Sequence, residues 1–178
     1  GDDVRSIDWR ATARHGDLMV RREEQSWHST ITVLLDDRAH AHEGAGAGST
    51  FEWAVSAAAS VAVHFQGLGW RVTVLSTTGR VLAETSLGGS GDLDALLEGF
   101  AEARLVDGPM SLGLGLDTDA STAVVAVLGR ITDDATSALA RPVAGFAGCL
   151  LRDPGPVAFL QSQGWRVATW TRSTRVDD

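Results

Sequence analysis

The sequence of 178 residues contains one cysteine, no lysine and no long apolar run. Cys149 has no second cysteine to pair with, which excludes an intrachain disulfide. Its apolar neighbours predict a buried, inert thiol. No apolar run approaches the roughly 18 to 20 residues that cross a bilayer, and no signal-peptide pattern is present. Because the chain begins at Gly1 without an initiator Met, we expect it to be a fragment of a longer protein.

Positive charge is also scarce. The net charge is −8 and the pI is near 5.0, whereas nucleic acids and anionic lipids recruit clusters of basic side chains. Nucleic acid is therefore not an expected partner. The 15 basic residues are all Arg. A GC-rich coding bias explains this, and a need for forked hydrogen bonds is the alternative. With 44% apolar residues, the chain is long enough for one well-buried core.

The first half of the sequence alternates strand and helix signals. Ser49 followed by Glu52 is the pattern of a capping box, which predicts a helix starting at about Phe51. Gly67 and Gly69 are expected to end this helix. A short β-branched run precedes it, and a hairpin and a second helix follow it. The expected elements are strands 30–35, 70–75 and 80–84, with helices from 51 and around 93–100.

The second half continues the alternation after a Gly-rich stretch, 106–121, whose structure we leave open. Strands that alternate with helices at this spacing indicate a largely parallel sheet covered on both faces. The expected elements are strands 123–128, 143–151 and 165–170, with helices 133–140 and 156–163.

The opening residues carry a specific motif. The run from Gly1 to Arg14 reads Gly-Asp-Asp-x-Arg-x-Ile-Asp-Trp-x-x-x-Ala-Arg, and a strand ending Leu34-Leu35-Asp36-Asp37 follows it. This pairing resembles the bacterial domain-of-unknown-function family fifty-eight. The resemblance implies an α/β, von Willebrand factor A-like (Rossmann-like) sandwich, with an antiparallel edge hairpin. It also implies a membrane-anchored parent protein at the cytoplasmic face, which works beside a MoxR-type AAA+ ATPase.

The loop after the first strand is where chemistry is expected, because open α/β sheets bind ligands at the carboxyl ends of their strands. A metal-ion-dependent adhesion site begins Asp-x-Ser-x-Ser. Here Asp36 takes the first position, but Arg38 and His40 replace both hydroxyl residues. Mg²⁺ prefers hard oxygen ligands. We therefore favour a degenerate site in which Arg38 pairs with a carboxylate. The alternative is a divalent-metal site that uses Asp36 and a distant Ser111.

Two other ligand sites are weaker alternatives. His40 and His42 stand beside acidic residues and are candidate ligands of Zn²⁺, although solvated loop histidines explain them more simply. The Gly-rich turn 44–50 precedes a helix and so suits an anion, but it lacks the Lys of a phosphate loop. A capped helix start is the favoured interpretation. Asp133 and Asp134 follow the strand ending at Leu128 too late to supply the expected second carboxylate.

The N-terminal motif has two interpretations. Its Arg and Asp side chains and Trp9 form a structural clasp on the domain, or they face a partner protein, since Trp and Arg are favoured interface residues. We favour a clasp. The expected domains are an arm, 1–28, packed on one globular unit, 29–178. We expect a non-catalytic interaction domain without a cofactor. Its expected partner-binding residues are Arg5, Asp8, Trp9, Arg14, Asp36, Asp37, Arg38 and His40.

Overall fold

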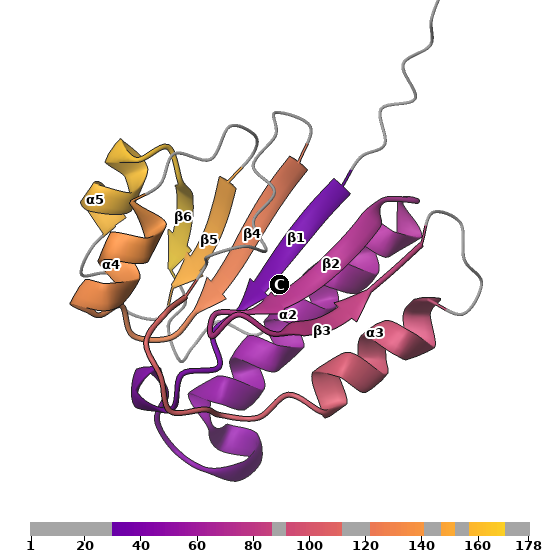
Figure 1. Cartoon of the computed structure of the whole chain (residues 1–178), viewed down its shortest axis with the longest axis horizontal. Helices are drawn as coiled ribbons and strands as arrows, with labels where there is room; N and C mark the ends of the chain where they lie inside the picture. The colour runs from indigo at the N-terminus through magenta and orange to yellow at the C-terminus, as the bar shows by residue number, and fades with distance from the viewer. Residues whose placement is uncertain (1–29, 87–91, 112–121, 141–146, 152–156, 170–178) are drawn as a thin grey trace, which may run out of the picture.

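The computed structural model describes residues 30–86, 92–111, 122–140, 147–151 and 157–169. The N-terminal arm, 1–28, with Arg5, Asp8, Trp9 and Arg14, lies outside these residues. So does most of the Gly-rich stretch 106–121, for which the sequence predicted no structure. The described residues form a six-stranded sheet in the order β3-β2-β1-β4-β5-β6 (Figure 1). All neighbouring strands are parallel except the antiparallel pair of β2 and β3. The expected mostly parallel α/β sheet with an edge hairpin is confirmed.

The observed elements match the expected order closely. The strands are β1 Thr30–Leu35, β2 Arg71–Ser76, β3 Val81–Glu84, β4 Thr122–Leu128, β5 Ala147–Leu151 and β6 Arg166–Thr169. The helices are α2 Thr50–Gly67, α3 Asp92–Ala101, α4 Asp133–Leu139 and α5 Val157–Ser162, with short 3-10 turns η2 Ala39–Ala41 and η3 Gly46–Gly48. None of the described helices is long and apolar enough to cross a membrane.

The start of α2 is held by only half of the expected capping box. The Ser49 hydroxyl accepts the backbone N–H of Glu52 at 3.1 Å, which satisfies one of the free donors of the first turn. The backbone N–H of Ser49, however, donates to the Gly46 carbonyl at 2.9 Å. The η3 turn of the Gly-rich segment therefore supplies the acceptor that we expected from the Glu52 side chain.

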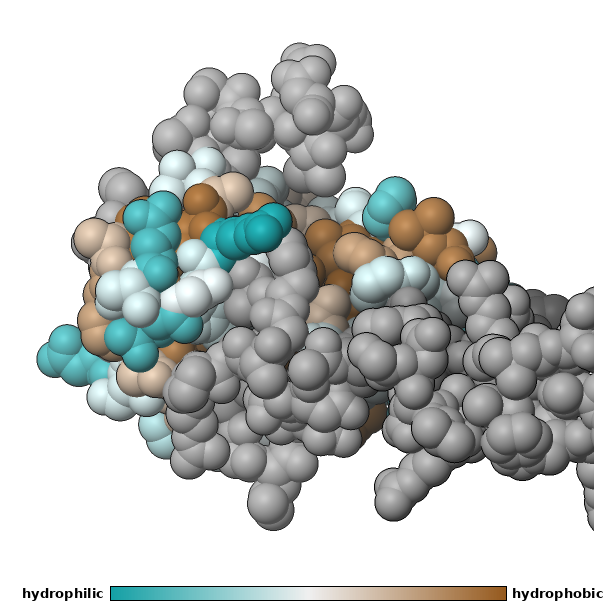
Figure 2. Space-filling model, turned by 90° about the horizontal axis from the view of Figure 1, so that it is seen from above, coloured by the Kyte–Doolittle hydropathy of each residue, from teal (hydrophilic) through white to brown (hydrophobic). Residues whose placement is uncertain are grey.

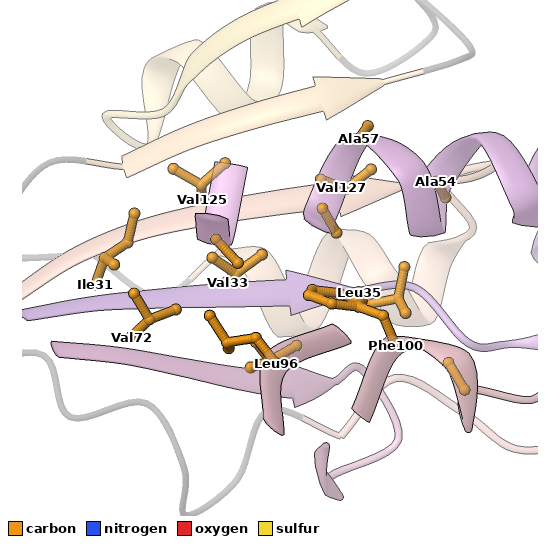
Figure 3. Packing of buried hydrophobic residues seen from close by; sticks show 14 of the residues in the cluster. Ile31, Val33, Leu35, Ala54, Ala57, Val72, Leu96, Phe100, Val125 and Val127 are labelled. Carbon is orange, nitrogen blue, oxygen red and sulfur yellow. The ribbon is translucent and has the colours of Figure 1, made fainter. Parts of the chain in front are cut away.

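Alternate residues of the central strand face opposite layers, because successive side chains of a strand point to opposite sides. On one side, Ile31, Val33 and Leu35 of β1 pack against α2 and α3, including Leu96 and Phe100 of α3 (Figure 3). On the other side, Leu34 packs in a second core with α4 and α5. The sheet is thus covered on both faces by helices (Figure 1).

The second core also holds the single cysteine. Cys149 is 2% exposed and lies with Leu128, Leu139 and Leu160. Burial, with a smaller effect of the Asp36 charge, raises the pKa of its thiol to about 12. The expected burial of the thiol is confirmed, and the raised pKa disfavours the thiolate, which is the reactive form.

Helix α3 lies close against the edge strand β3. A Cβ atom at Gly99 would lie 2.4 Å from the carbonyl oxygen of Leu82 and 2.9 Å from the Cβ of Ala83. Only a glycine allows this approach, and it fixes α3 over β3.

Viewed from above, the coloured part of the molecular surface mixes hydrophilic and hydrophobic patches (Figure 2).

Candidate functional site

The strand order places the candidate site at the carboxyl end of β1. From β1 the sheet grows towards β2 on one side and towards β4 on the other, so the connections diverge between β1 and β4. Such switch points leave a crevice in open α/β sheets. The residues that follow β1, β2 and β4 meet at this edge because the three strands run parallel.

Arg38 is the centre of this edge. Its Nε donates to Oδ1 of Asp36 at 2.8 Å and its Nη2 donates to Oδ2 at 2.8 Å, so the fork of the guanidinium matches both carboxylate oxygens. Both side chains are 0% exposed. Burial acts to lower the pKa of Arg38, but its contacts with Asp36 and Asp134 outweigh burial and raise it. The guanidinium therefore stays charged, and the pairing of Arg38 with a carboxylate is confirmed.

The third nitrogen of Arg38 reaches the segment after β4. Its Nη1 donates to the hydroxyl of Thr132 at 2.9 Å and lies 3.4 Å from Oδ2 of Asp134, while Nη2 lies 3.3 Å from the Arg130 carbonyl oxygen. From the sequence, Asp134 was expected to lie too many residues after the strand ending at Leu128 to join the site. That expectation is wrong, because a short loop and the first turn of α4 bring its carboxylate back towards β1.

Asp134 is held as an anion by several donors. The Thr132 hydroxyl and the Met110 N–H donate to it, the latter at 2.9 Å. Partial burial acts to raise the pKa of Asp134, but these hydrogen bonds and the charge of Arg38 lower it well below its ordinary value. The carboxylate thus links α4 to the segment before Ser111.

Asp36 receives two further hydrogen bonds from neighbouring strands. The Thr77 hydroxyl, after β2, donates to Oδ1 at 3.1 Å, and the Gly129 N–H, after β4, donates to Oδ2 at 3.1 Å. A Cβ atom at Gly129 would lie 2.3 Å from the Ala41 carbonyl oxygen, so the close packing of the two loops requires glycine. Both carboxylate oxygens of Asp36 are consequently engaged by protein donors.

The carboxylate of Asp37 does not pair with Arg38 but accepts hydrogen bonds from the turn between β2 and β3. Its carboxylate accepts the N–H of Thr78 at 3.1 Å and the Thr78 hydroxyl at 2.7 Å. Its backbone carbonyl accepts the Val106 N–H at 2.7 Å. Asp37 is 0% exposed, so its side chain holds the hairpin turn rather than facing solvent.

The two loop histidines have different positions. His40 is exposed, as a solvated loop residue would be. His42 is half-buried, with Nε2 2.8 Å from the Asp36 carbonyl and Nδ1 3.2 Å from the Thr50 hydroxyl. Burial lowers the pKa of His42 despite the opposing effect of Asp36. The interpretation of His42 as a solvated residue is wrong, because it fastens the end of β1 to the start of α2.

The arrangement does not fit a divalent cation. The described residues contain no cluster of three or more His, Cys, Asp or Glu side chains able to hold a metal. The oxygens of Asp36 are occupied by Arg38, Thr77 and Gly129, and a guanidinium repels a cation at this point. Ser111 is exposed, and its N–H donates to the Thr77 carbonyl at 2.7 Å. Among the residues that the structure describes, the hydroxyls that reach the Arg38–Asp36 pair are those of Thr77 and Thr132.

The Gly-rich turn also has a structural explanation. Besides the Ser49 cap, the Thr50 hydroxyl accepts the Glu43 N–H at 2.8 Å and ties the two ends of the turn together. These contacts are those of a capped helix start, the interpretation that the sequence favoured over an anion site.

Removing Arg38 is expected to be far more destabilising than removing an exposed arginine. Arg38→Ala would leave the buried charge of Asp36 without a counterion, which typically costs about 3–5 kcal/mol of unfolding free energy. Arg130→Ala is the matched control, because Arg130 forms an exposed pair with Glu43 and such pairs contribute about 0–1 kcal/mol. Urea unfolding of both variants measures the difference. Equal effects would contradict a structural role of the buried pair.

The lowered pKa of Asp134 predicts a pH-dependent contribution to stability. A carboxylate whose pKa is lower in the folded state stabilises the fold above its unfolded pKa of about 4, and loses this effect as the pH falls towards the folded value. Asp134→Asn should therefore destabilise the protein at neutral pH, and the difference from wild type should shrink below about pH 4. Urea unfolding across this range measures it.

The exposed neighbour Asp133 supplies the control for this experiment. Asp133→Asn is expected to change the unfolding free energy by no more than about 0.5 kcal/mol, as is usual for surface substitutions. A difference between wild type and Asp134→Asn that stays constant with pH would show that the charge of Asp134 contributes nothing.

Comparison with known proteins identifies the family of this chain. A family model described as "Protein of unknown function DUF58" matches residues 1–133. The match covers more than half of the chain, so the chain belongs to this family, the one that its N-terminal motif resembles. No curated protein matched the sequence.

Proposed function

We propose that this member of the DUF58 family is a non-catalytic protein-interaction domain, an adaptor that works with a MoxR-type AAA+ ATPase or with its client. In this proposal the fold is von Willebrand factor A-like, and the edge around Asp36 is a degenerate metal-ion-dependent adhesion site. The ATPase partner and the membrane-anchored parent protein, at the cytoplasmic face, come from the family resemblance and not from the geometry.

One observation carries the proposal. The guanidinium of Arg38 lies among oxygen atoms of Asp36, Thr132 and Asp134. Asp36 follows β1, whereas Thr132 and Asp134 belong to the N-cap and first turn of α4. Carboxylate and hydroxyl oxygens are the hard donors that Mg²⁺ prefers. A fixed side-chain cation thus satisfies donors of the kind that would otherwise coordinate a metal.

The same geometry divides the expected binding residues into two groups. Asp36, Asp37 and Arg38 are all 0% exposed, so in this proposal they act by holding the loop rather than by touching the partner. His40 is exposed on the η2 turn between them and α2. The pair formed by Arg130 and Glu43 is also exposed, and the Arg130 N–H donates to the Ala41 carbonyl of the η2 turn at 2.8 Å. A partner would therefore contact the rim of the site and not its buried centre.

A divalent-metal-dependent ligand-binding domain is the second candidate, with Asp36 and Ser111 as its metal residues. The buried carboxylate at the end of β1 favours this candidate. The bidentate pairing of that carboxylate with Arg38 argues against it. Calorimetry with Mg²⁺, Mn²⁺ and Zn²⁺ separates the candidates, since only a metal-binding domain gives saturable heat.

Restoring the two missing hydroxyls is expected to create a metal site. Arg38→Ser with His40→Ser gives the sequence Asp-x-Ser-x-Ser and removes the competing guanidinium. We expect this double variant to bind Mg²⁺ or Mn²⁺ with saturable heat, and wild type to give none. His40→Ser alone is the control, because it keeps Arg38 in place. Saturable Mg²⁺ binding by wild type would overturn the degenerate site and favour the second candidate.

The adaptor role predicts capture of the ATPase through the exposed rim. The full chain, immobilised, is expected to retain a MoxR-type ATPase from the same organism, and His40→Ala should weaken retention because it removes an exposed side chain at the rim. Arg71→Ala is the control, since Arg71 is exposed at the start of β2, away from the carboxyl ends of the strands. An empty pull-down, or equal loss with both variants, contradicts the proposal.

A further inference from the structure

Helix α3 carries an exposed apolar row that the fold does not use. Leu96 and Phe100 of this helix are buried in the core, but Leu93 is 41% exposed and Leu97 is 47% exposed. The two exposed leucines are four residues apart, so they lie on one side of the helix, and the exposed Ala101 continues the row. Leu105, 44% exposed, follows just beyond the helix.

An acidic row runs beside the leucines. Asp94, Glu98 and Glu102 are exposed and are also four residues apart. Within the residues that the structure describes, none of these carboxylates forms an ion pair. The helix Asp92–Ala101 itself contains no basic residue. This side of α3 thus combines apolar surface with a row of carboxylates. Arg104, just beyond the helix, donates its Nη1 to the Ala101 and Ala103 carbonyls at 3.3 Å rather than pairing with this row.

We propose that this face of α3, defined by Leu93, Leu97, Asp94 and Glu98, docks an amphipathic helix of another protein, with an apolar row flanked by Arg or Lys. Rows at i and i+4 are the ridges that pack between helices. Basic side chains would complement the acidic row and steer the partner to this face. The proposal rests on the proposed role as an interaction domain, but it concerns a different surface from the rim around His40.

Charge favours a basic occupant over a second copy of the chain and over an anionic lipid surface. A second copy of the chain would bring the same acidic row against this one, and like charges across an interface are unfavourable. An anionic lipid surface would be repelled for the same reason. A basic amphipathic helix satisfies both rows at once.

Helix α3 is tightly packed on the sheet. Gly99 places α3 directly on the backbone of Leu82, and Leu96 is fully buried between the helix and the sheet. A face that is already fixed costs little ordering free energy on binding. The exposed leucines can therefore act as anchors without rearrangement of the fold.

The test measures binding of a synthetic helical peptide, with a leucine row flanked by lysines, to the full chain by fluorescence anisotropy. The double variant Leu93→Ser with Leu97→Ser is expected to bind roughly tenfold more weakly or worse, as loss of interface anchors does. Leu68→Ser is the matched control, since Leu68 is 61% exposed at the end of α2. Glu98→Gln removes one negative charge inside the face, and its control Glu52→Gln, on α2, removes one outside it. Only Glu98→Gln is expected to weaken binding of the peptide.

Several outcomes would overturn the proposal. These are the absence of saturable binding, equal affinity for a scrambled peptide of the same composition, or equal losses in each variant and its control. A dimer that Leu97→Ser dissociates would make a second copy the occupant. Tighter peptide binding after Arg5, Arg10 and Arg14 are changed to Glu would make the chain's own arm the occupant. The peptide assay contains no ATPase, so it tests the α3 face separately from the adaptor role. If the peptide binds but the pull-down retains no ATPase, only the adaptor role with that ATPase is rejected.

Discussion

The buried ion pair of Arg38 and Asp36 is the interaction on which the functional edge of the sheet depends. Transferring two charges from water to a protein interior costs several kcal/mol per ion, and this is offset only when geometry and hydrogen bonding are good. Here the guanidinium is matched to both carboxylate oxygens, and Thr77 and Gly129 donate to the same carboxylate. The pair therefore joins the ends of β1, β2 and β4.

The pair also explains why one arginine of this chain could not be a lysine. The all-arginine composition is compatible with a coding bias, but Arg38 uses three nitrogens in fixed directions, towards Asp36, Thr132 and the Arg130 carbonyl. A lysine has a single ammonium group and cannot span these acceptors in the same way. At this position the forked geometry matters, whatever the origin of the composition.

The sequence predicted those parts of the fold that depend on local signals. The run from Thr30 to Leu35 and the cap at Ser49 identified β1 and the start of α2, because both signals lie within a few neighbouring residues. The pairing of Arg38 with a carboxylate followed from an unsuitable residue type at a metal position. These predictions required no knowledge of which strands are neighbours.

The missed residues depend on strand order and on loop geometry. Thr77 was not among the expected site residues, yet it reaches Asp36 because β2 is the parallel neighbour of β1. Asp134 was placed too far along the chain, although the first turn of α4 returns it to Arg38. The strand order would have indicated Thr77, because residues after parallel strands share one edge. The orientation of His42 towards Asp36 had no comparable signal.

The central place of β1 in the sheet has a consequence for how the chain folds. β1 pairs with β2 soon after it in the sequence, but its other neighbour, β4, follows only after a much longer stretch of chain. Contacts between distant segments carry a larger loop-closure entropy. During synthesis, the unit from β1 to β3 emerges from the ribosome before β4 exists, so Arg38 can meet Asp36 early, while Thr132 and Asp134 join them only when the second half of the sheet assembles.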